Sequence, residues 1–98
     1  MFKIVHPQKA ENEQGVSIES GGRFTTIYSD GVREMNFAKE GGFDEKGNHV
    51  LNIRWRLPLK WNPPHHEEIV SVEDAEKIKA NITEAVAVLG SIPKFTDI

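Results

Sequence analysis

The sequence predicts an α+β domain in which a curved antiparallel sheet of about four to five strands carries one C-terminal amphipathic helix. Three observations predict it: an alternating apolar and polar run over 51–61, a hairpin signal at Asp30-Gly31, and a capped apolar stripe over 72–89. Several antiparallel strands followed by one helix bury their apolar surfaces best when the helix lies across the sheet. The 98 residues suffice for one core, so we expect a single domain over 1–98.

The run over 51–61 predicts the strand that anchors the core. Its odd-numbered positions are all Leu, Ile or Trp, and its even-numbered positions are Asn, Arg, Pro or Lys. A period of two places the first set on a buried sheet face and the second in water. Trp55 is therefore expected to be mostly buried, with Arg54 and Arg56 exposed. Pro58 cannot donate to a ladder, so the strand lies at an edge or bends there.

Shorter strand signals precede this run. We expect strands over 2–6, 16–19, 23–29 and 32–39. Asp30-Gly31 matches a two-residue type I′ turn, which needs positive φ at both central residues. That turn would pair Phe24 with Phe37 and Thr26 with Met35, so that the apolar side chains share one face. Residues 7–15 and 41–49 are polar or glycine-rich and predict loops.

The segment over 72–89 predicts the one long helix. Ser71 is a good N-cap with Asp74 three residues on, and Gly90 suits the position after the last turn. The apolar residues of the segment form a stripe about 100° wide, the width expected for packing on a sheet. They are Ala75, Ile78, Ile82, Ala85, Val86 and Leu89. The tail over 91–98 is expected to be loosely held.

Composition excludes several classes of protein. The chain has no cysteine, so it has neither disulfides nor thiolate metal ligands. No apolar run approaches the roughly 20 residues of a membrane span, and the N-terminus lacks the apolar stretch of a signal peptide. We therefore expect a cytoplasmic protein with no membrane partner. The net charge of −3 gives no overall case for binding nucleic acid.

No pattern of catalytic residues stands out, and we expect a protein that is not an enzyme and needs no cofactor. There is no nucleophile elbow, phosphate loop or dinucleotide fingerprint. His65-His66-Glu67-Glu68 suggests metal ligands at first sight. Adjacent residues on an extended chain point in opposite directions, however, and no third ligand is specified. No metal site is therefore expected there.

Charge is unevenly distributed along the chain. Between Trp61 and Glu76 there are five acidic residues and no Lys or Arg. One interpretation is a solvated loop that runs into a helix N-terminus, where acidic residues are favourable. The functional interpretation is an acidic docking surface for a basic partner.

The basic residues of the long strand suggest a different function. Arg54, Arg56 and Lys60 flank tryptophans, and basic and aromatic residues together bind single-stranded nucleic acid. Stacking requires both kinds of residue on one exposed face, whereas the alternation places them on opposite faces. A curved sheet followed by one helix is nevertheless similar to the coactivator-type fold that binds single-stranded DNA. Its concave face would here be lined by these three residues.

Two local patterns point to a family. Residues 21–35 read Gly-Gly-Arg-Phe-Thr-Thr-Ile-Tyr-Ser-Asp-Gly-Val-Arg-Glu-Met, a glycine-turn hairpin carrying Tyr28 and Arg33. Residues 60–78 read Lys-Trp-Asn-Pro-Pro-His-His-Glu-Glu-Ile-Val-Ser-Val-Glu-Asp-Ala-Glu-Lys-Ile. Together they resemble a bacterial immunity-protein family of polymorphic toxin and contact-dependent growth inhibition systems (immunity protein 74 type). The resemblance covers roughly residues 16–85, and the charged, glycine-rich stretch over 39–49 departs from the family pattern.

The resemblance implies a non-enzymatic immunity protein that binds and neutralises a cognate toxin domain, such as a nuclease. Such a protein needs a stable scaffold and a surface complementary in charge to its toxin. Nucleases carry basic clefts, so an acidic inhibitor gains fast association and selectivity. We expect the partner-binding residues to be Asp44, Glu45, Trp61, His65, His66, Glu67 and Glu68.

Overall fold

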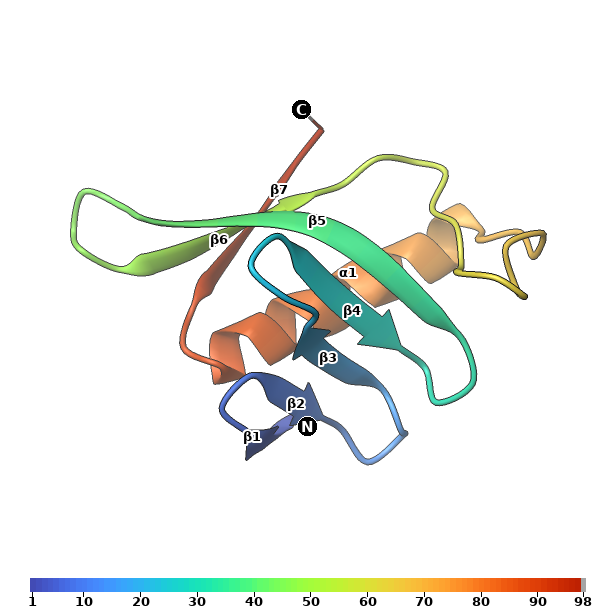
Figure 1. Ribbon diagram of the computed structural model, residues 1–98, viewed down its shortest axis with the longest axis horizontal. Helices are drawn as coiled ribbons and strands as arrows, with labels where there is room; N and C mark the ends of the chain where they lie inside the picture. Colours follow the sequence, from blue (N-terminus) through green and yellow to red (C-terminus); the bar gives the residue numbers. More distant parts are fainter. Residues whose placement is uncertain (98) are drawn as a thin grey trace.

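Seven strands follow one another in chain order across one twisted sheet, and helix α1 lies across one face of it (Figure 1). The computed structural model describes residues 1–97. The strands are β1 (Lys3–His6), β2 (Lys9–Glu11), β3 (Ser17–Ser20), β4 (Thr25–Ser29), β5 (Glu34–Phe43), β6 (His49–Arg54) and β7 (Ile92–Thr96), and α1 spans Val72–Val88. Neighbouring strands are antiparallel except β6 and β7. The predicted α+β class is confirmed, but the expected four to five strands are too few.

The two additional strands were expected to be irregular. β2 lies within the predicted loop over 7–15, and β7 lies within the tail that was expected to be loosely held. β7 pairs in parallel with β6, from Val50 opposite Ile92 to Arg54 opposite Thr96. A parallel pair needs a long crossover connection, and α1 supplies it here. The tail over 91–97 is therefore part of the sheet, and Ile98 lies outside the described residues.

The long alternating run is not one strand. β6 ends at Arg54, and the Trp55 amide makes the last ladder bond, to the Thr96 carbonyl at 2.7 Å. The chain then leaves the sheet, and Leu57 is 51% exposed. It returns over the start of β5, where Leu59 and Trp61 are buried. The alternation thus identifies Ile53, Leu59 and Trp61 correctly as buried, but not Leu57. Leu59 and Trp61 lie in the irregular segment over 55–61, which we call the strap.

The β4–β5 hairpin has the predicted faces but a different register. Thr26 pairs with Phe37 and Tyr28 with Met35, so the loop comprises residues 30–33 and not two residues. The Asp30 amide donates to the Arg33 carbonyl, and the Asp30 carboxylate accepts from the amides of residues 32 and 33. This side-chain capping favours the longer loop. Because the register moves by two residues, Thr26, Met35 and Phe37 still face the core, as a period of two requires. The predicted pairing of Phe24 with Phe37 is wrong, since Phe24 lies outside β4 and is 63% exposed.

The core lies between the sheet and α1. Its largest fully buried apolar side chains come from β3, β5, β6 and α1: Ile18, Met35, Ile53, Ile82 and Val86. The predicted boundaries of α1 are confirmed, because the Asp74 amide donates to Ser71 Oγ at 3.0 Å. At the other end, Gly90 adopts φ +94°, and the Ser91 and Gly90 amides donate to the carbonyls of Val86 and Ala87. Within residues 1–97 no helix is long and apolar enough to cross a membrane.

The two tryptophans differ in burial. Trp61 is 5% exposed, and Trp55 is mostly buried, as predicted, although it is one of the partly buried residues that pack against the core. Trp55 stacks on Phe37 with ring centroids 5.6 Å apart and meets Phe95 edge-on at 5.3 Å. The predicted exposure of Arg54 and Arg56 is confirmed.

Replacing each tryptophan by alanine should reveal this difference. Trp61→Ala is expected to lower the free energy of unfolding by about 3–5 kcal/mol, as for buried aromatic residues. Trp55→Ala should cost clearly less, because Trp55 is partly and not fully buried. Urea denaturation followed by circular dichroism measures both values. An equal or larger cost for Trp55→Ala would contradict this assignment of the core.

Candidate partner-binding surfaces

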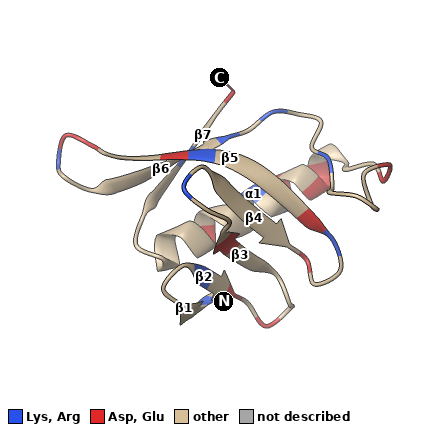
Figure 2. Cartoon of the chain, viewed as in Figure 1, with Lys and Arg blue, Asp and Glu red and all other residues tan. Residues whose placement is uncertain are grey.

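The residues predicted to bind a partner lie in two separate places. His65, His66, Glu67 and Glu68 belong to the segment over 62–71, which we call the acidic loop, immediately before α1. Asp44 and Glu45 lie at the tip of the β5–β6 hairpin. Figure 2 shows these two acidic regions at opposite ends of the molecule. The predicted set therefore does not form one surface.

Arg33 fixes the acidic loop to the end of the β4–β5 hairpin. Its guanidinium lies over the Trp61 ring, 4.2 Å from the centroid. Nε and one terminal nitrogen each approach Asp30 Oδ2 at 2.9 Å, and the other terminal nitrogen donates to Glu68 Oε1 at 2.8 Å. The second oxygen of Glu68 pairs with Nδ1 of His65. We call Asp30, Arg33, Trp61, His65 and Glu68 the Arg33 cluster.

The charges of the Arg33 cluster are mutually stabilised. The pKa of Glu68 is lowered by the hydrogen bond with His65 and, beyond that, by the Arg33 guanidinium. Burial raises the pKa of Asp30, but hydrogen bonds from the Arg33 and Val32 amides and from the guanidinium outweigh it, so the net shift is downward. The same carboxylates raise the pKa of Arg33. These carboxylates thus stay ionised at neutral pH and hold the loop.

Backbone contacts complete the attachment of the acidic loop. The Asn62 amide donates to the Glu34 carbonyl at 2.7 Å, and its side chain donates to Asn36 at 3.0 Å. Two turns follow, in which the amides of His65 and Glu68 donate to the carbonyls three residues earlier. The loop is therefore held at its start and in its middle by the β4–β5 hairpin.

Beyond these contacts the acidic loop displays both charge and apolar surface. Glu67 is exposed and lies outside the Arg33 cluster, and Ile69 beside it is 91% exposed. The first turn of α1 adds Glu73 and Asp74, and Val72 is also largely exposed. An exposed apolar side chain among acidic ones is typical of a protein-binding surface. We call Glu67, Ile69, Val72, Glu73 and Asp74 the acidic face.

Several residues predicted to contact a partner also have structural roles. Trp61 is buried under Arg33, and Glu68 and His65 belong to the Arg33 cluster. Asp44 shapes the β5–β6 turn, because its Oδ1 accepts from the amides of Lys46 and Asn48 at 2.9 Å. These hydrogen bonds, led by the one from the Asn48 amide, lower the pKa of Asp44.

Three of the predicted residues take part in none of these structural contacts. His66, Glu67 and Glu45 are exposed. The exposure of Ile69 and the role of Arg33 were not predicted from the sequence. The Asp30-to-Arg33 spacing could have indicated an ion pair across a turn, but nothing in it could have indicated Glu68 as a third partner.

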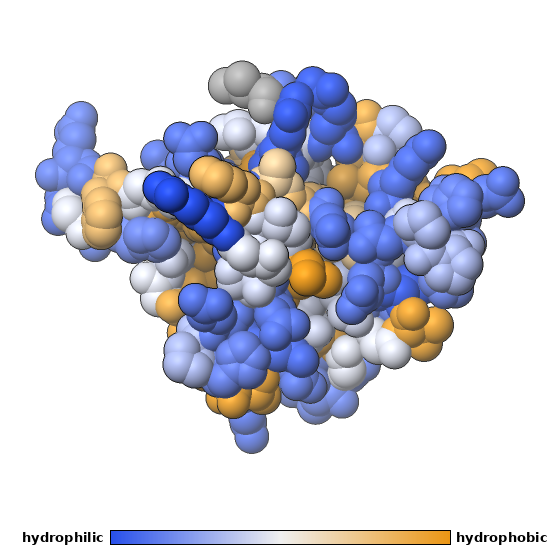
Figure 3. All heavy atoms as spheres, in the orientation of Figure 1, coloured by the Kyte–Doolittle hydropathy of each residue, from blue (hydrophilic) through white to orange (hydrophobic). Residues whose placement is uncertain are grey.

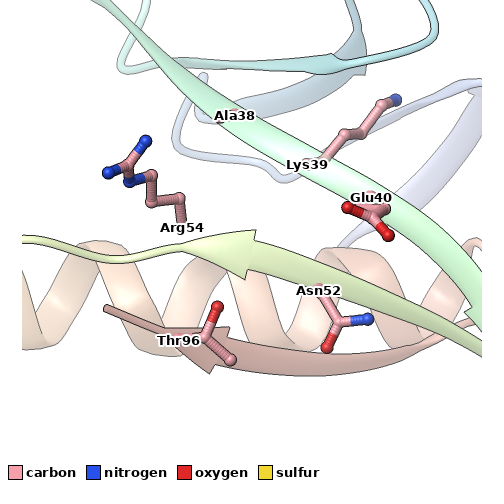
Figure 4. A pocket seen from close by; sticks show the side chains of 6 residues that line it. All are labelled: Ala38, Lys39, Glu40, Asn52, Arg54 and Thr96. Atoms are coloured by element: carbon pink, nitrogen blue, oxygen red, sulfur yellow. The ribbon is translucent and has the colours of Figure 1, made fainter. Parts of the chain in front are cut away.

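The uncovered face of the sheet carries a basic groove. A hollow of about 410 Å³ is lined by β5, β6 and β7, and in Figure 4 Glu40, Asn52, Arg54 and Thr96 lie around it. A neighbouring hollow of about 290 Å³ shares Ala38 and Arg54 and adds Arg56 and Lys60. The three basic residues named for the nucleic-acid alternative therefore line one groove, although α1 covers the other face.

The groove differs from a single-strand-binding surface in its lack of aromatic residues. None of the side chains lining these two hollows is Trp or Tyr, and the lone Phe, Phe37, is a buried core residue. Arg56 already pairs with Asp97, at 3.2 Å. In Figure 3, which is viewed from the same side as Figure 1, hydrophilic residues cover much of the surface and the apolar ones form separate patches. Binding there would depend on charge and not on stacking.

Within residues 1–97 no group of three or more His, Asp or Glu side chains lies close enough to hold a metal ion.

Comparison of the chain with models of known protein families, with curated proteins and with solved structures gives no match in any of the three.

The pKa shifts in the Arg33 cluster predict a dependence of stability on pH. The lowered pKa of Glu68, from an ordinary value of 4.5, means that its stabilising effect is complete above that value. The effect is lost as the pH falls through the lowered value. Glu68→Gln should therefore lose less unfolding free energy than the unchanged protein between about pH 6 and about pH 3.

Urea denaturation at several pH values measures this difference. Glu45→Gln, at the far hairpin tip, is the matched control and should follow the unchanged protein. If Glu68→Gln and Glu45→Gln gave the same pH profile, the Glu68 carboxylate would not hold the loop.

Proposed function

We propose that this chain is a non-enzymatic immunity protein that binds and neutralises a cognate bacterial toxin domain through its acidic face. The observation that carries the proposal is the way in which the acidic loop is held. The Arg33 cluster fixes its middle to the sheet, while Glu67 and the 91% exposed Ile69 project from it. The loop is thus fixed by one set of side chains and free to bind with another.

This arrangement has the physical properties of a binding surface. A loop that is already ordered loses less conformational entropy on association, which favours affinity. Ile69 offers an apolar group for a pocket of the partner, and such central anchors contribute most of the binding energy. Glu67 on the same loop, with Glu73 and Asp74 in the first turn of α1, favours a basic partner and speeds its association. A toxin domain that cleaves nucleic acid has the complementary charge.

The two segments that resemble the immunity family also support the proposal. Arg33 comes from the first segment, and Trp61 and Glu68 come from the second. They meet in the Arg33 cluster, through the stacking of Arg33 on Trp61 and its bond to Glu68. Tyr28 of the first segment lies next to the Trp61 ring, with centroids 6.3 Å apart. The segments of the resemblance are therefore those that build and hold the acidic face.

Co-expression with the toxin encoded by a neighbouring gene tests the proposal. The unchanged protein should restore growth, and Glu67→Lys combined with Glu73→Lys should abolish the protection because it reverses the charge of the acidic face. Glu68 is left unchanged because its replacement would also release the loop. Glu40→Lys combined with Glu84→Lys is the matched control, with the same change of net charge at exposed positions outside the predicted partner-binding residues, and should still protect.

Purified proteins give the second readout of the same experiment. The association rate with the toxin domain should fall as salt rises, since exposed charges are screened over about 8–10 Å at physiological ionic strength. Loss of protection by both double variants alike would show that net charge matters and the acidic face does not. Failure of the unchanged protein to protect against any adjacent toxin would contradict the immunity proposal.

A second candidate function is binding of single-stranded nucleic acid, which the basic groove favours. Arg54, Arg56 and Lys60 line that groove together. A fluorescence titration with a labelled oligonucleotide distinguishes the two functions. Sub-micromolar binding that is lost in Arg54→Ala with Lys60→Ala, without protection from a toxin, would replace the immunity proposal by this one.

A further inference from the structure

Two adjoining hollows lie near the C-terminal end of α1, away from the acidic face. The inner hollow has a volume of about 230 Å³ and is bounded by β3, β5, β6 and the last turns of α1. The outer hollow, of about 400 Å³, shares Ser20, Lys39, His49 and Leu51 with it and opens toward Arg23. We call them together the Lys39 cleft. Small-molecule sites occur in concave regions of this kind, and the inner volume suits a ligand smaller than a drug.

Lys39 carries the one charge at the junction of the two hollows. Figure 4 shows its side chain extending from β5 away from β6, and its pairing with the buried Ile53 places it on the sheet face turned away from Arg54. Nζ donates to Ser20 Oγ at 2.7 Å, and Ser20 Oγ in turn donates to the Gly22 carbonyl. An ammonium group has three protons to donate, so two remain for another acceptor.

No carboxylate neutralises Lys39 in the described part of the chain. Ser20 is the one polar side chain bonded to its ammonium group, and burial lowers the pKa of Lys39 without any acidic neighbour to oppose the shift. Of the described residues that line the two hollows, none is Asp or Glu, although the chain has 15 acidic residues. A partly buried cation without a counter-ion is costly, and an anion placed beside it would be stabilised.

The remaining walls define what kind of anion would fit. The inner hollow is lined by the aliphatic side chains of Ile18, Leu51, Val86 and Leu89. The polar residues that line it are Gln8, Ser20, Thr26, Lys39, His49 and Ser91, and Nδ1 of His49 lies 2.6 Å from Ser91 Oγ. Nε2 of the same ring lies close to Gly41, because a Cβ added to that glycine would be only 3.2 Å from Nε2. The ligand thus needs an apolar body to contact the aliphatic walls and a hydrogen-bond acceptor to meet the Lys39 ammonium group.

We propose that the Lys39 cleft binds a small organic carboxylate, whose carboxylate accepts hydrogen bonds from the Lys39 ammonium and whose aliphatic body fills the inner hollow. This site is independent of the acidic face. α1 has 17 residues and rises about 1.5 Å per residue, so its two ends lie about 25 Å apart. Experiments can therefore disprove toxin binding by the acidic face without disproving carboxylate binding in the Lys39 cleft, and the reverse.

Titration with hexanoate, followed by amide chemical shifts in NMR, tests the proposal. Saturable shifts are expected at Ser20, Lys39 and His49. Hexanol matches the aliphatic body without the charge, and inorganic phosphate supplies charge without the body. Both should bind at least about tenfold more weakly, because a hydrogen bond to a charged group and the burial of an apolar chain each contribute on that scale.

Three variants complete the experiment. Lys39→Met keeps the length of the side chain but removes the charge, and should weaken hexanoate binding by about 10- to 100-fold. Leu89→Phe leaves Lys39 in place and puts a larger side chain into the inner hollow, so it should also reduce hexanoate binding. It provides an independent test if Lys39→Met is too unstable to measure. Lys77→Met, on the exposed side of α1, should bind as the unchanged protein does.

Two results would overturn the proposal. One is the absence of saturable shifts at millimolar hexanoate in the unchanged, folded protein. The other is hexanoate binding that neither Lys39→Met nor Leu89→Phe weakens. Tighter binding of phosphate than of hexanoate would also contradict it, because it would show an anion site that does not use the inner hollow.

Discussion

The stacking of Arg33 on Trp61, with Asp30 on one side and Glu68 on the other, is the interaction on which the functional surface depends. It joins three parts of the chain that the backbone alone would leave apart: the β4–β5 turn, the strap that leaves β6, and the acidic loop. A planar guanidinium suits this position because it can lie on an aromatic face and still donate to two carboxylates in its plane. A lysine could not make all of these contacts.

The arrangement of α1 separates the two ends of the molecule. Its N-terminus continues the acidic loop, and its C-terminus closes the Lys39 cleft before the chain returns as β7 beside β6 (Figure 1). Acidic residues in the first turn of α1 are favourable because the partial positive charge of a helix lies at that end. The same residues extend the acidic face, so local helix stability and the proposed recognition of a basic partner favour the same side chains.

Local signals in the sequence predicted the fold class, α1 with its caps, and the sheet faces of β3 to β6. These features depend on residues close together in the chain. The β4–β5 register was wrong by two residues because the Asp30 side chain caps a longer loop. β7 was missed because its pairing with β6 depends on a crossover through α1, and Pro93 weakens any strand signal. Of the predicted binding residues, Glu67 and His66 are exposed and lie outside the Arg33 cluster, whereas Trp61 and Glu68 belong to that cluster and fix the acidic loop in place. Nothing local distinguishes these roles, because Arg33 lies 35 residues from Glu68.

The acidic face can act as a preformed binding surface only if Arg33 keeps the acidic loop ordered in solution. The most direct measurement is the ¹⁵N relaxation order parameter of the amides over residues 65–69, in the unchanged protein and in Arg33→Met. The methionine keeps apolar contact with Trp61 but removes the bonds to Asp30 and Glu68. We predict order parameters near about 0.85 in the unchanged protein and below about 0.6 in the variant, with α1 rigid in both. A loop that is equally ordered in both proteins, or mobile in both, would contradict the account.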